Sequence, residues 1–354
     1  MQAIPELGSL RQELRLAGIF KHRELRSWLK LGVLLSVIAL CVVAISMYGW
    51  IAAFCLVPVC AVFSTAAAMM GHEGSHRSTS KSPGRNALMA YFAFPVFSGL
   101  SLLYWREKHD RLHHGHPNVE GVDPDIRPWP FVSSKGDHER ATPRLRWFQR
   151  TFQKWAFWPM STMMAIGMRR SSVIFLVQSW KKTGFTREWG QDVVAVALHY
   201  VLWLLVPALI WGPLAAFLFY LGVWAGVGVS LALVFLPAHA GLPIVLEQNK
   251  DWVHQLETTR NLEMPKFISY FFIGLDYQAE HHLFPKIPHQ NLPLAARITR
   301  AWCEKHGVPY LSEPYISALR DAAGYMASGW EREACDPLHV RAGLVGSDSA
   351  QLAA

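Results

Sequence analysis

Charged side chains are scarce in this chain. Only 17% of the 354 residues are Asp, Glu, Lys or Arg, against about 25% in an average soluble protein. The five cysteines form no CxxC pair, which excludes a disulfide framework, a zinc ribbon and a Cys-ligated iron–sulfur cluster. Neither a GxGxxG fingerprint nor a CxxCH motif is present, so the sequence predicts no bound flavin or haem. Disorder is excluded for most of the chain, because 51% of the residues are hydrophobic.

Two long stretches have almost no charge at all. Residues 31–70 contain no Asp, Glu, Lys, Arg or His, and residues 193–238 contain only His199. Gly49-Trp50 and Trp211-Gly212-Pro213 divide these stretches into halves of about 20 residues, the length of a helix that crosses a bilayer. The sequence therefore predicts an all-α integral membrane protein with four transmembrane helices in two hairpins and a cytoplasmic helical cap. Two pairs of core helices in a soluble protein are the alternative.

The basic residues all lie to one side of the predicted hairpins. Of the 34 Lys and Arg residues, six precede residue 31, eighteen lie within 71–190 and ten follow residue 238, whereas the two hairpin turns have none. By the positive-inside rule, both termini and the middle segment are expected in the cytoplasm. The net charge of +8 then marks a membrane face and does not indicate nucleic acid. The expected divisions are a cytoplasmic N-terminal segment (1–30), a first hairpin (31–70), a cytoplasmic or interfacial segment (71–190), a second hairpin (191–238), a second cytoplasmic segment (239–336) and a disordered tail (337–354).

One further apolar segment, Asn86–Trp105, is almost long enough to cross the membrane. A full crossing would put His72 and His109 on opposite faces. Pro95 lies in the middle of the segment, and the charge distribution also argues against a crossing. We therefore expect a re-entrant or interfacial helix.

Histidines gather in three short motifs beside the predicted membrane helices. Because residues four apart share a helix face, each HxxxH pair is expected to point in one direction, with His114 and His282 reaching a second point nearby. Neutral imidazole is the commonest transition-metal ligand, so the motifs predict two adjacent metal ions. The motifs GHEGSH, HDRLHHGHPN and QAEHHLFP contribute His72, His76, His109, His113, His114, His281 and His282.

Three acidic residues stand next to these histidines. Glu73, Asp110 and Glu280 are placed to orient the ring nitrogens of metal ligands, and each is equally compatible with a solvated neighbour. His199, inside the third predicted span, is expected to bond to a neighbouring helix, with a substrate-channel role as the alternative. Six other histidines are expected to be solvated: His22, His138, His254, His289, His306 and His339.

The three motifs resemble the histidine boxes of the membrane fatty-acid desaturases, an integral-membrane diiron superfamily that also includes hydroxylases and ketolases. The resemblance extends from the first hairpin to about Pro293 and includes the order and separation of the motifs. Gln278, at the head of the third motif, and the following LFPKIPHQNL are similar to the acyl-lipid and front-end branch.

This resemblance implies a fatty acyl desaturase that uses dioxygen and two iron ions. The implied substrate is a fatty acyl lipid, an acyl-CoA or an acyl-carrier conjugate. The family has a further ligand near the end of the fourth helix, where His239 stands; a helix-capping histidine is the alternative. Gln278 is expected to hold a hydrogen bond or a water molecule, because its amide is a poor iron ligand. A separate electron donor is implied, such as a ferredoxin or a small cytochrome with its reductase.

Two other functions stay open at this stage. The histidine boxes alone do not separate a desaturase from a lipid or carotenoid hydroxylase or ketolase of the same superfamily. A membrane metal transporter is less favoured, because transport sites lie near the bilayer midplane and these histidines are expected at the membrane edge.

Overall fold

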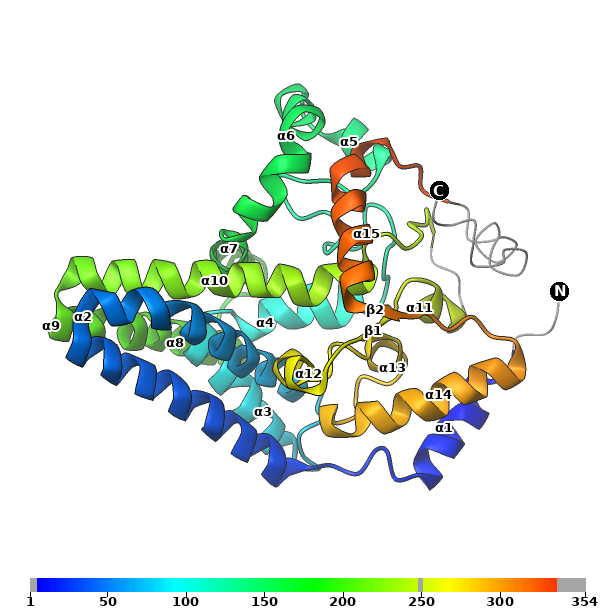
Figure 1. The fold of residues 1–354 in the computed structure, drawn as a ribbon, viewed down its shortest axis with the longest axis horizontal. Helices are drawn as coiled ribbons and strands as arrows, with labels where there is room; N and C mark the ends of the chain where they lie inside the picture. Colours follow the sequence, from blue (N-terminus) through cyan, green and yellow to red (C-terminus); the bar gives the residue numbers. More distant parts are fainter. Residues whose placement is uncertain (1–4, 248–250, 336–354) are drawn as a thin grey trace.

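The computed structural model of the protein describes residues 5–247 and 251–335, so the tail expected at 337–354 lies outside the described residues. The chain folds into helices of very unequal length and one pair of short strands (Figure 1). The predicted helical character is confirmed. In chain order the elements are α1 (Leu7–Leu16), α2 (Glu24–Ser75), α3 (Pro83–Tyr91), η1 (Phe92–Ser98), α4 (Leu102–Trp105), η2 (Arg106–His113), α5 (Lys135–Arg140), α6 (Pro143–Ser161), α7 (Met164–Thr183), α8 (Arg187–Tyr200), η3 (Val201–Leu205), α9 (Val206–Trp211), α10 (Pro213–His239), α11 (Val253–Glu257), β1 (Asn261–Glu263), α12 (Lys266–Phe272), α13 (Gln278–Leu283), η4 (His289–Asn291), α14 (Leu292–His306), β2 (Ser312–Pro314), α15 (Tyr315–Ser328) and η5 (Gly329–Glu331).

Three helices of the described chain are long and apolar enough to cross a membrane: α2, the continuous run from α8 to α9, and α10. As one straight rod, the 52 residues of α2 would measure about 78 Å, more than twice the roughly 30 Å of a bilayer core. Gly49, with a φ of 70°, interrupts the helix, and Figure 1 shows two arms that fold back on each other. Cys41 and Cys60, on opposite arms, belong to the same buried apolar cluster. The predicted break at Gly49-Trp50 is confirmed.

Helix α10 is central to this apolar bundle. It packs against α2 and α7 and buries Val223, Trp224 and Val227. The approach to α2 is close, since a Cβ atom on Gly226 would stand 2.5 Å from the Cβ of Ala61. Small residues at helix contacts allow this packing where neighbouring lipid is as apolar as the side chains.

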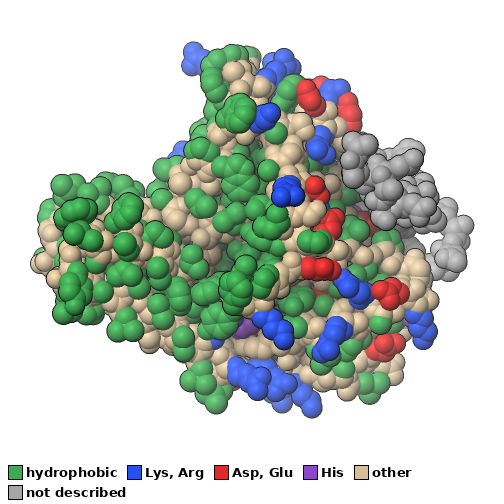
Figure 2. Space-filling view, in the orientation of Figure 1, with side chains coloured by type: hydrophobic (Ala, Val, Ile, Leu, Met, Phe, Trp, Pro, Cys, Tyr) green, Lys and Arg blue, Asp and Glu red, His purple; other side chains and the backbone are tan. Residues whose placement is uncertain are grey.

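The outer surface of the bundle is apolar as well. Trp50, Phe54 and Leu209 are each at least 80% exposed. Figure 2 shows hydrophobic side chains over the end of the molecule where α9 lies, and charged side chains gathered over the other half. Soluble monomers rarely expose an apolar surface of this extent, so the bundle fits a lipid environment.

Residues 83–113 form two helical arms with a sharp bend. The first arm is α3 with η1 and the second is α4 with η2, and the arms are bent by 108°. Gly99, at the break, has a φ of 69°, which glycine adopts without steric cost. The rings of His72, before this segment, and His109, within it, lie 2.9 Å apart between Nε2 atoms. Residues 86–105 therefore do not form one straight helix.

Several of the remaining elements lie at the end of the bundle away from α9: α1, α11, α13, α14 and the two strands (Figure 1). Strands β1 and β2 form a parallel pair with Leu262 opposite Glu313. Helix α1 packs against α14, and Leu10 and Leu14 share a buried cluster with Trp302. The first helix of the described chain thus packs against a helix that follows the third histidine motif.

Candidate metal centre

Eight histidines converge into two neighbouring groups. Within each group the candidate ligand atoms all lie within 4.8 Å of one another. Each of the eight was predicted from the sequence, seven from the motifs and one from the family resemblance. The groups are His72, His76, His109, His114 and His281, and His113, His239 and His282.

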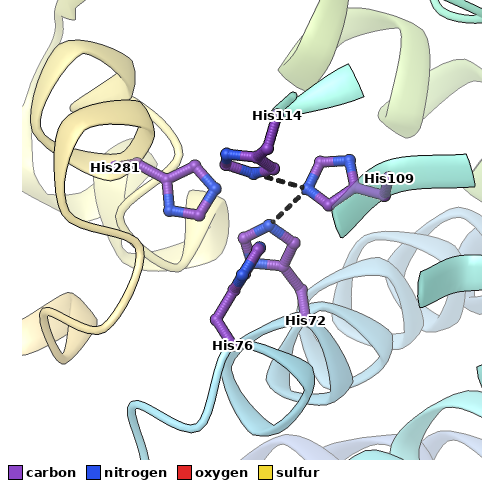
Figure 3. Close-up of side chains that lie close together, drawn as sticks. All are labelled: His72, His76, His109, His114 and His281. Carbon is purple, nitrogen blue, oxygen red and sulfur yellow. Dashed lines mark hydrogen bonds between the residues drawn. The ribbon is translucent and has the colours of Figure 1, made fainter. Parts of the chain in front are cut away.

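The group of five joins three segments that are distant in sequence (Figure 3). His72 and His76 lie at the end of α2, His109 lies in η2, and His281 lies in α13. The Nε2 atoms of His72 and His114 are 2.9 and 3.1 Å from Nε2 of His109. Only one proton can occupy the space between two facing nitrogens, so at least one ring of each pair presents a lone pair to its neighbour.

Hydrogen bonds from Nδ1 orient the three rings of the second group. With the proton on Nδ1, each ring keeps a lone pair on Nε2 that faces the interior of the group. The Nε2 atoms of His239 and His282 are buried without a hydrogen-bond partner in the described chain. Each Nδ1–H donates to an acceptor 3.0–3.1 Å away: the carboxylate of Asp123 for His113, the carbonyl of Thr258 for His239, and Oε1 of Gln255 for His282.

A π-helix determines which histidines share a group. The segment η2 is π-helical, and the N–H of His114 bonds to the carbonyl of His109, five residues earlier. His114 therefore lies in the group of five, whereas His113 lies in the group of three. His109 and His113 still lie close together, as their spacing predicted, since their ring nitrogens and a carboxylate oxygen of Asp125 also lie within 4.8 Å of one another. The expectation that His114 joins His282 at the second point is wrong, because it assumed the four-residue spacing of an α-helix.

Burial favours the neutral form of these imidazoles except at His113, where the carboxylates of Asp123 and Asp125 outweigh burial and raise the pKa. Burial, followed by the neighbouring histidines, lowers the pKa of His114, His281 and His282 well below the ordinary value of histidine. Buried ring nitrogens without partners are costly in a folded protein, and here several face one another. Neutral, inward-facing imidazoles in two adjacent groups fit the donor set of two transition-metal ions.

Two of the acidic residues expected beside the histidines differ in what they contact. Asp110 lies close to His76, with 3.7 Å between Oδ1 and Nε2. Glu73 instead accepts a 2.6 Å bond from Nδ1 of His289, and its carboxylate is buried. Asp110 thus lies near His76 without a hydrogen bond to it, whereas Glu73 ties the end of α2 to the loop before α14.

The third motif has its own buried polar contacts. Glu280 accepts bonds from Asn261 at 2.8 Å and from the hydroxyl of Tyr310 at 2.9 Å, and burial raises its pKa to about 7. Glu280 therefore holds α13 against β1. Gln278 is fully buried, and its Nε2 has no hydrogen-bond partner in the described chain, which leaves a free donor beside the motif.

The sequence did not reveal the acceptors that orient the group of three. Gln255 and Thr258 come from α11 and the residue after it, a short element without helical periodicity in its polar residues. Asp123 follows the second motif in the stretch VDPD. The two acidic residues of this stretch, so close to the motif, could have indicated a carboxylate that orients a ligand. Asp125, the other member of that pair, forms an ion pair with Lys108.

Three histidines expected to be solvated are buried instead, so that expectation is wrong for them. Each ring is paired, and this pairing makes its burial possible. His339 lies outside the described residues. The pairs are His138 Nδ1 with Gln149 Oε1 at 2.7 Å, His254 Nε2 with the Pro117 carbonyl at 2.9 Å, and His289 Nδ1 with Glu73 at 2.6 Å.

Replacing Asp123 with asparagine is expected to weaken metal binding about 10-fold or more, which is the usual effect of removing a carboxylate that orients a histidine ligand. The change removes the charged acceptor that fixes the ring of His113. Metal affinity would be measured by competition with a chelator, with exposed Glu304→Gln as the charge-matched control. Equal affinities for the two variants would contradict an orienting role for Asp123.

Comparisons with known proteins agree with this geometry. The sequence profile of the fatty acid desaturase family matches residues 48–314. Fatty acid desaturase 3 of Bos taurus is 26% identical over 328 residues, which are 90% of this chain and 72% of that protein. The Delta(6)-fatty-acid desaturase fat-3 of Caenorhabditis elegans is 27% identical over 324 residues, 87% of this chain and 71% of that protein. The Delta(8)-fatty-acid desaturase of Euglena gracilis is 27% identical over 250 residues, 68% and 59% of the two chains. Across such relatives, the chain spans from 55% to 72% of their length.

Proposed function

The chain belongs to the fatty acid desaturase family, and from that premise we propose that it introduces a double bond into a fatty acyl chain. The substrate is an acyl lipid, an acyl-CoA or an acyl-carrier conjugate, and dioxygen is the oxidant. The observation that carries the proposal is the pair of adjacent histidine groups with unpartnered, inward-facing nitrogens. Family membership indicates the class of reaction, and these groups supply a place for its chemistry.

Two iron ions are the proposed metals, one for each histidine group. Iron would supply the oxygen activation needed to remove hydrogen from unactivated carbons, which amino-acid side chains do not provide. In the balanced reaction, –CH₂–CH₂–, O₂, two electrons and two protons give –CH=CH– and two water molecules. The electrons come from a separate donor, such as a ferredoxin or a small cytochrome with its reductase.

The residues of the chain orient the ligands and exclude water. Asp123, Gln255 and Thr258 keep the protons of the three-histidine group on Nδ1, so that each Nε2 faces inward. Trp105 stacks on His109, with 4.3 Å between the ring centroids. Ligands that are fixed in this way need little rearrangement on metal binding.

A cavity beside the histidines supports an acyl substrate with an anionic headgroup. It has a volume of about 340 Å³, and its lining includes Arg26, Lys30 and Lys266. A second cavity of about 10 Å³, lined by histidines of the group of five, shares His289 and Gly274 with it. We propose that the anionic headgroup binds near the three cations.

We place the protein in a membrane with four crossings: the two arms of α2, the run from α8 to α9, and α10. Both termini and the histidine groups lie on the cytoplasmic side in this proposal, with residues 83–113 as a re-entrant segment. The distribution of Lys and Arg supports this orientation. The bend of 108° within residues 83–113 supports the re-entrant arrangement.

The test is expression of the full chain in a host of known fatty acid composition. New unsaturated acids, with their double bonds located by mass spectrometry, are the expected products, and cells with the His113→Ala variant should lack them. Hydroxylated or keto products would instead support the alternative chemistry of the superfamily. An unchanged lipid profile, with the protein present and iron bound, would contradict desaturation.

A further inference from the structure

The sharp bend between η1 and α4 leaves backbone groups without helical partners. A helix ends with free carbonyls and begins with free N–H groups, and away from water each of these needs another partner. Four buried side chains from two other helices supply these partners at the bend. We call this set the bend clamp: Arg169 and Ser172 of α7, and Asp192 and His199 of α8.

Two members of the bend clamp bind the carbonyls at the end of η1. Nε of Arg169 donates to the carbonyl of Ser98 at 2.7 Å. Nδ1 of His199 donates to the carbonyl of Phe97 at 2.8 Å. Both donors are buried side chains, so the last turn of η1 ends on two fixed points.

The other two members bind the N–H groups that begin α4. The hydroxyl of Ser172 accepts a bond from the N–H of Ser101 at 2.9 Å. The carboxylate of Asp192 accepts from the N–H groups of Leu102 and Leu103, both at 3.0 Å, and from the hydroxyl of Ser101. Asp192, a residue of α8, therefore caps the N-terminus of α4.

Two residues of α10 contact the bend clamp. The hydroxyl of Tyr220 lies 3.0 Å from Nε2 of His199. The guanidinium carbon of Arg169 lies 3.7 Å from the ring centroid of Trp224, a cation–π contact. Arg169 Nη1 and Nη2 have no hydrogen-bond partner in the described chain, and the guanidinium also lies 5.4 Å from the ring centroid of Tyr220.

The direction of α4 sets the position of the second histidine motif. His109 follows the start of α4 by seven residues, a lever of about 10 Å. A tilt of about 5° at the bend would therefore move the ring by about 1 Å, whereas metal sites tolerate ligand displacements of about 0.2 Å. Small errors in the bend angle are thus large errors at the metal centre.

We propose that the bend clamp is the positioning element of the metal centre. By holding both ends of the break, it holds His109, His113 and His114 opposite the histidines of α2, α10 and α13. This inference rests on the proposed function, because it treats these histidines as metal ligands. It also assigns His199, within α8, a role through backbone geometry and not through contact with substrate.

The test measures cobalt binding by full-length protein in lipid nanodiscs after removal of metal by a chelator. His199→Phe keeps an aromatic ring but removes the donor to Phe97, and should weaken Co²⁺ binding about 10-fold and shift the cobalt absorption bands. His199→Asn puts an amide N–H near the place of Nδ1 and should restore both properties. Val196→Ala, a buried change in the same helix, should lower thermal stability with an unchanged cobalt titration.

Equal titrations for His199→Phe and the wild type would overturn the proposal, as would a failure of His199→Asn to restore binding. If His199→Phe does not accumulate, Ser172→Ala decides, because it removes a single acceptor of the bend clamp; unaltered cobalt bands would then overturn the proposal. Desaturation is not measured in this experiment. Absence of lipid products in the wild type would therefore count against the proposed function alone.

Discussion

Replacement of His282 by alanine is expected to remove one metal ion per chain and to reduce desaturation at least about 100-fold. His282 belongs to the group of three, so its loss leaves two imidazoles, too few to retain the metal. Removal of a supporting residue behind a ligand already costs about 10- to 100-fold, and removal of the ligand itself should exceed that. His76→Ala leaves four histidines in its own group and should lose less metal.

The measurements are metal content of the purified protein by mass spectrometry and fatty acid products from cells. His306→Ala is the control, because this histidine packs on Trp302 in α14 and belongs to neither group. A His282→Ala variant with full metal content and full product would contradict the assignment of the second group. A reverse order of metal loss, with His76→Ala the more damaging change, would contradict the division into five and three.

Replacement of Gly74 by alanine is expected to reduce the amount of folded protein severely. A Cβ atom at this position would stand 2.6 Å from the backbone nitrogen of Ala90 and 2.9 Å from the carbonyl oxygen of Asn86. Both obstacles are backbone atoms, so no side-chain rotation relieves the overlap. Overpacking of this kind costs about 1–3 kcal/mol or more, which exceeds the gain of about 1 kcal/mol from replacing glycine in a helix.

The thermal midpoint in detergent and the metal content of the purified protein would test this prediction. Gly74 lies between His72 and His76, so displacement of α3 from α2 should lower the metal content too. Gly32→Ala in the same helix is the matched control, because a Cβ there meets no atom within 4 Å. Similar midpoints for the two variants would contradict the packing argument.

Features that depend on residues close together in the sequence were predictable. The long helices and the break at Gly49 follow from runs of apolar residues and from a residue with unusual backbone freedom. The bend clamp, which binds the backbone at the break within residues 83–113, was not predictable. Asp192 caps a helix that precedes it by 90 residues in sequence, and no local pattern marks such a pair.

The site shows the same division. The sequence predicted the eight histidines, because each motif is short and the family resemblance supplied the eighth. It did not predict their distribution between two groups, since the π-helical hydrogen bond of His114 has no sequence signal comparable to a heptad or an HxxxH pair. It also missed the uncharged acceptors Gln255 and Thr258, which are common residues whose role depends on tertiary position alone.

The separation of the histidines along the chain determines when the centre can be completed during biosynthesis. More than 200 residues separate His72 from His282, and at about 5–20 residues per second a ribosome needs roughly 10–40 s to cover that interval. Helix α1 waits longer still, because its partner α14 follows the third motif. If the proposed metal centre forms, the long helices are thus synthesised before its last ligand, and metal loading follows translation of the third motif.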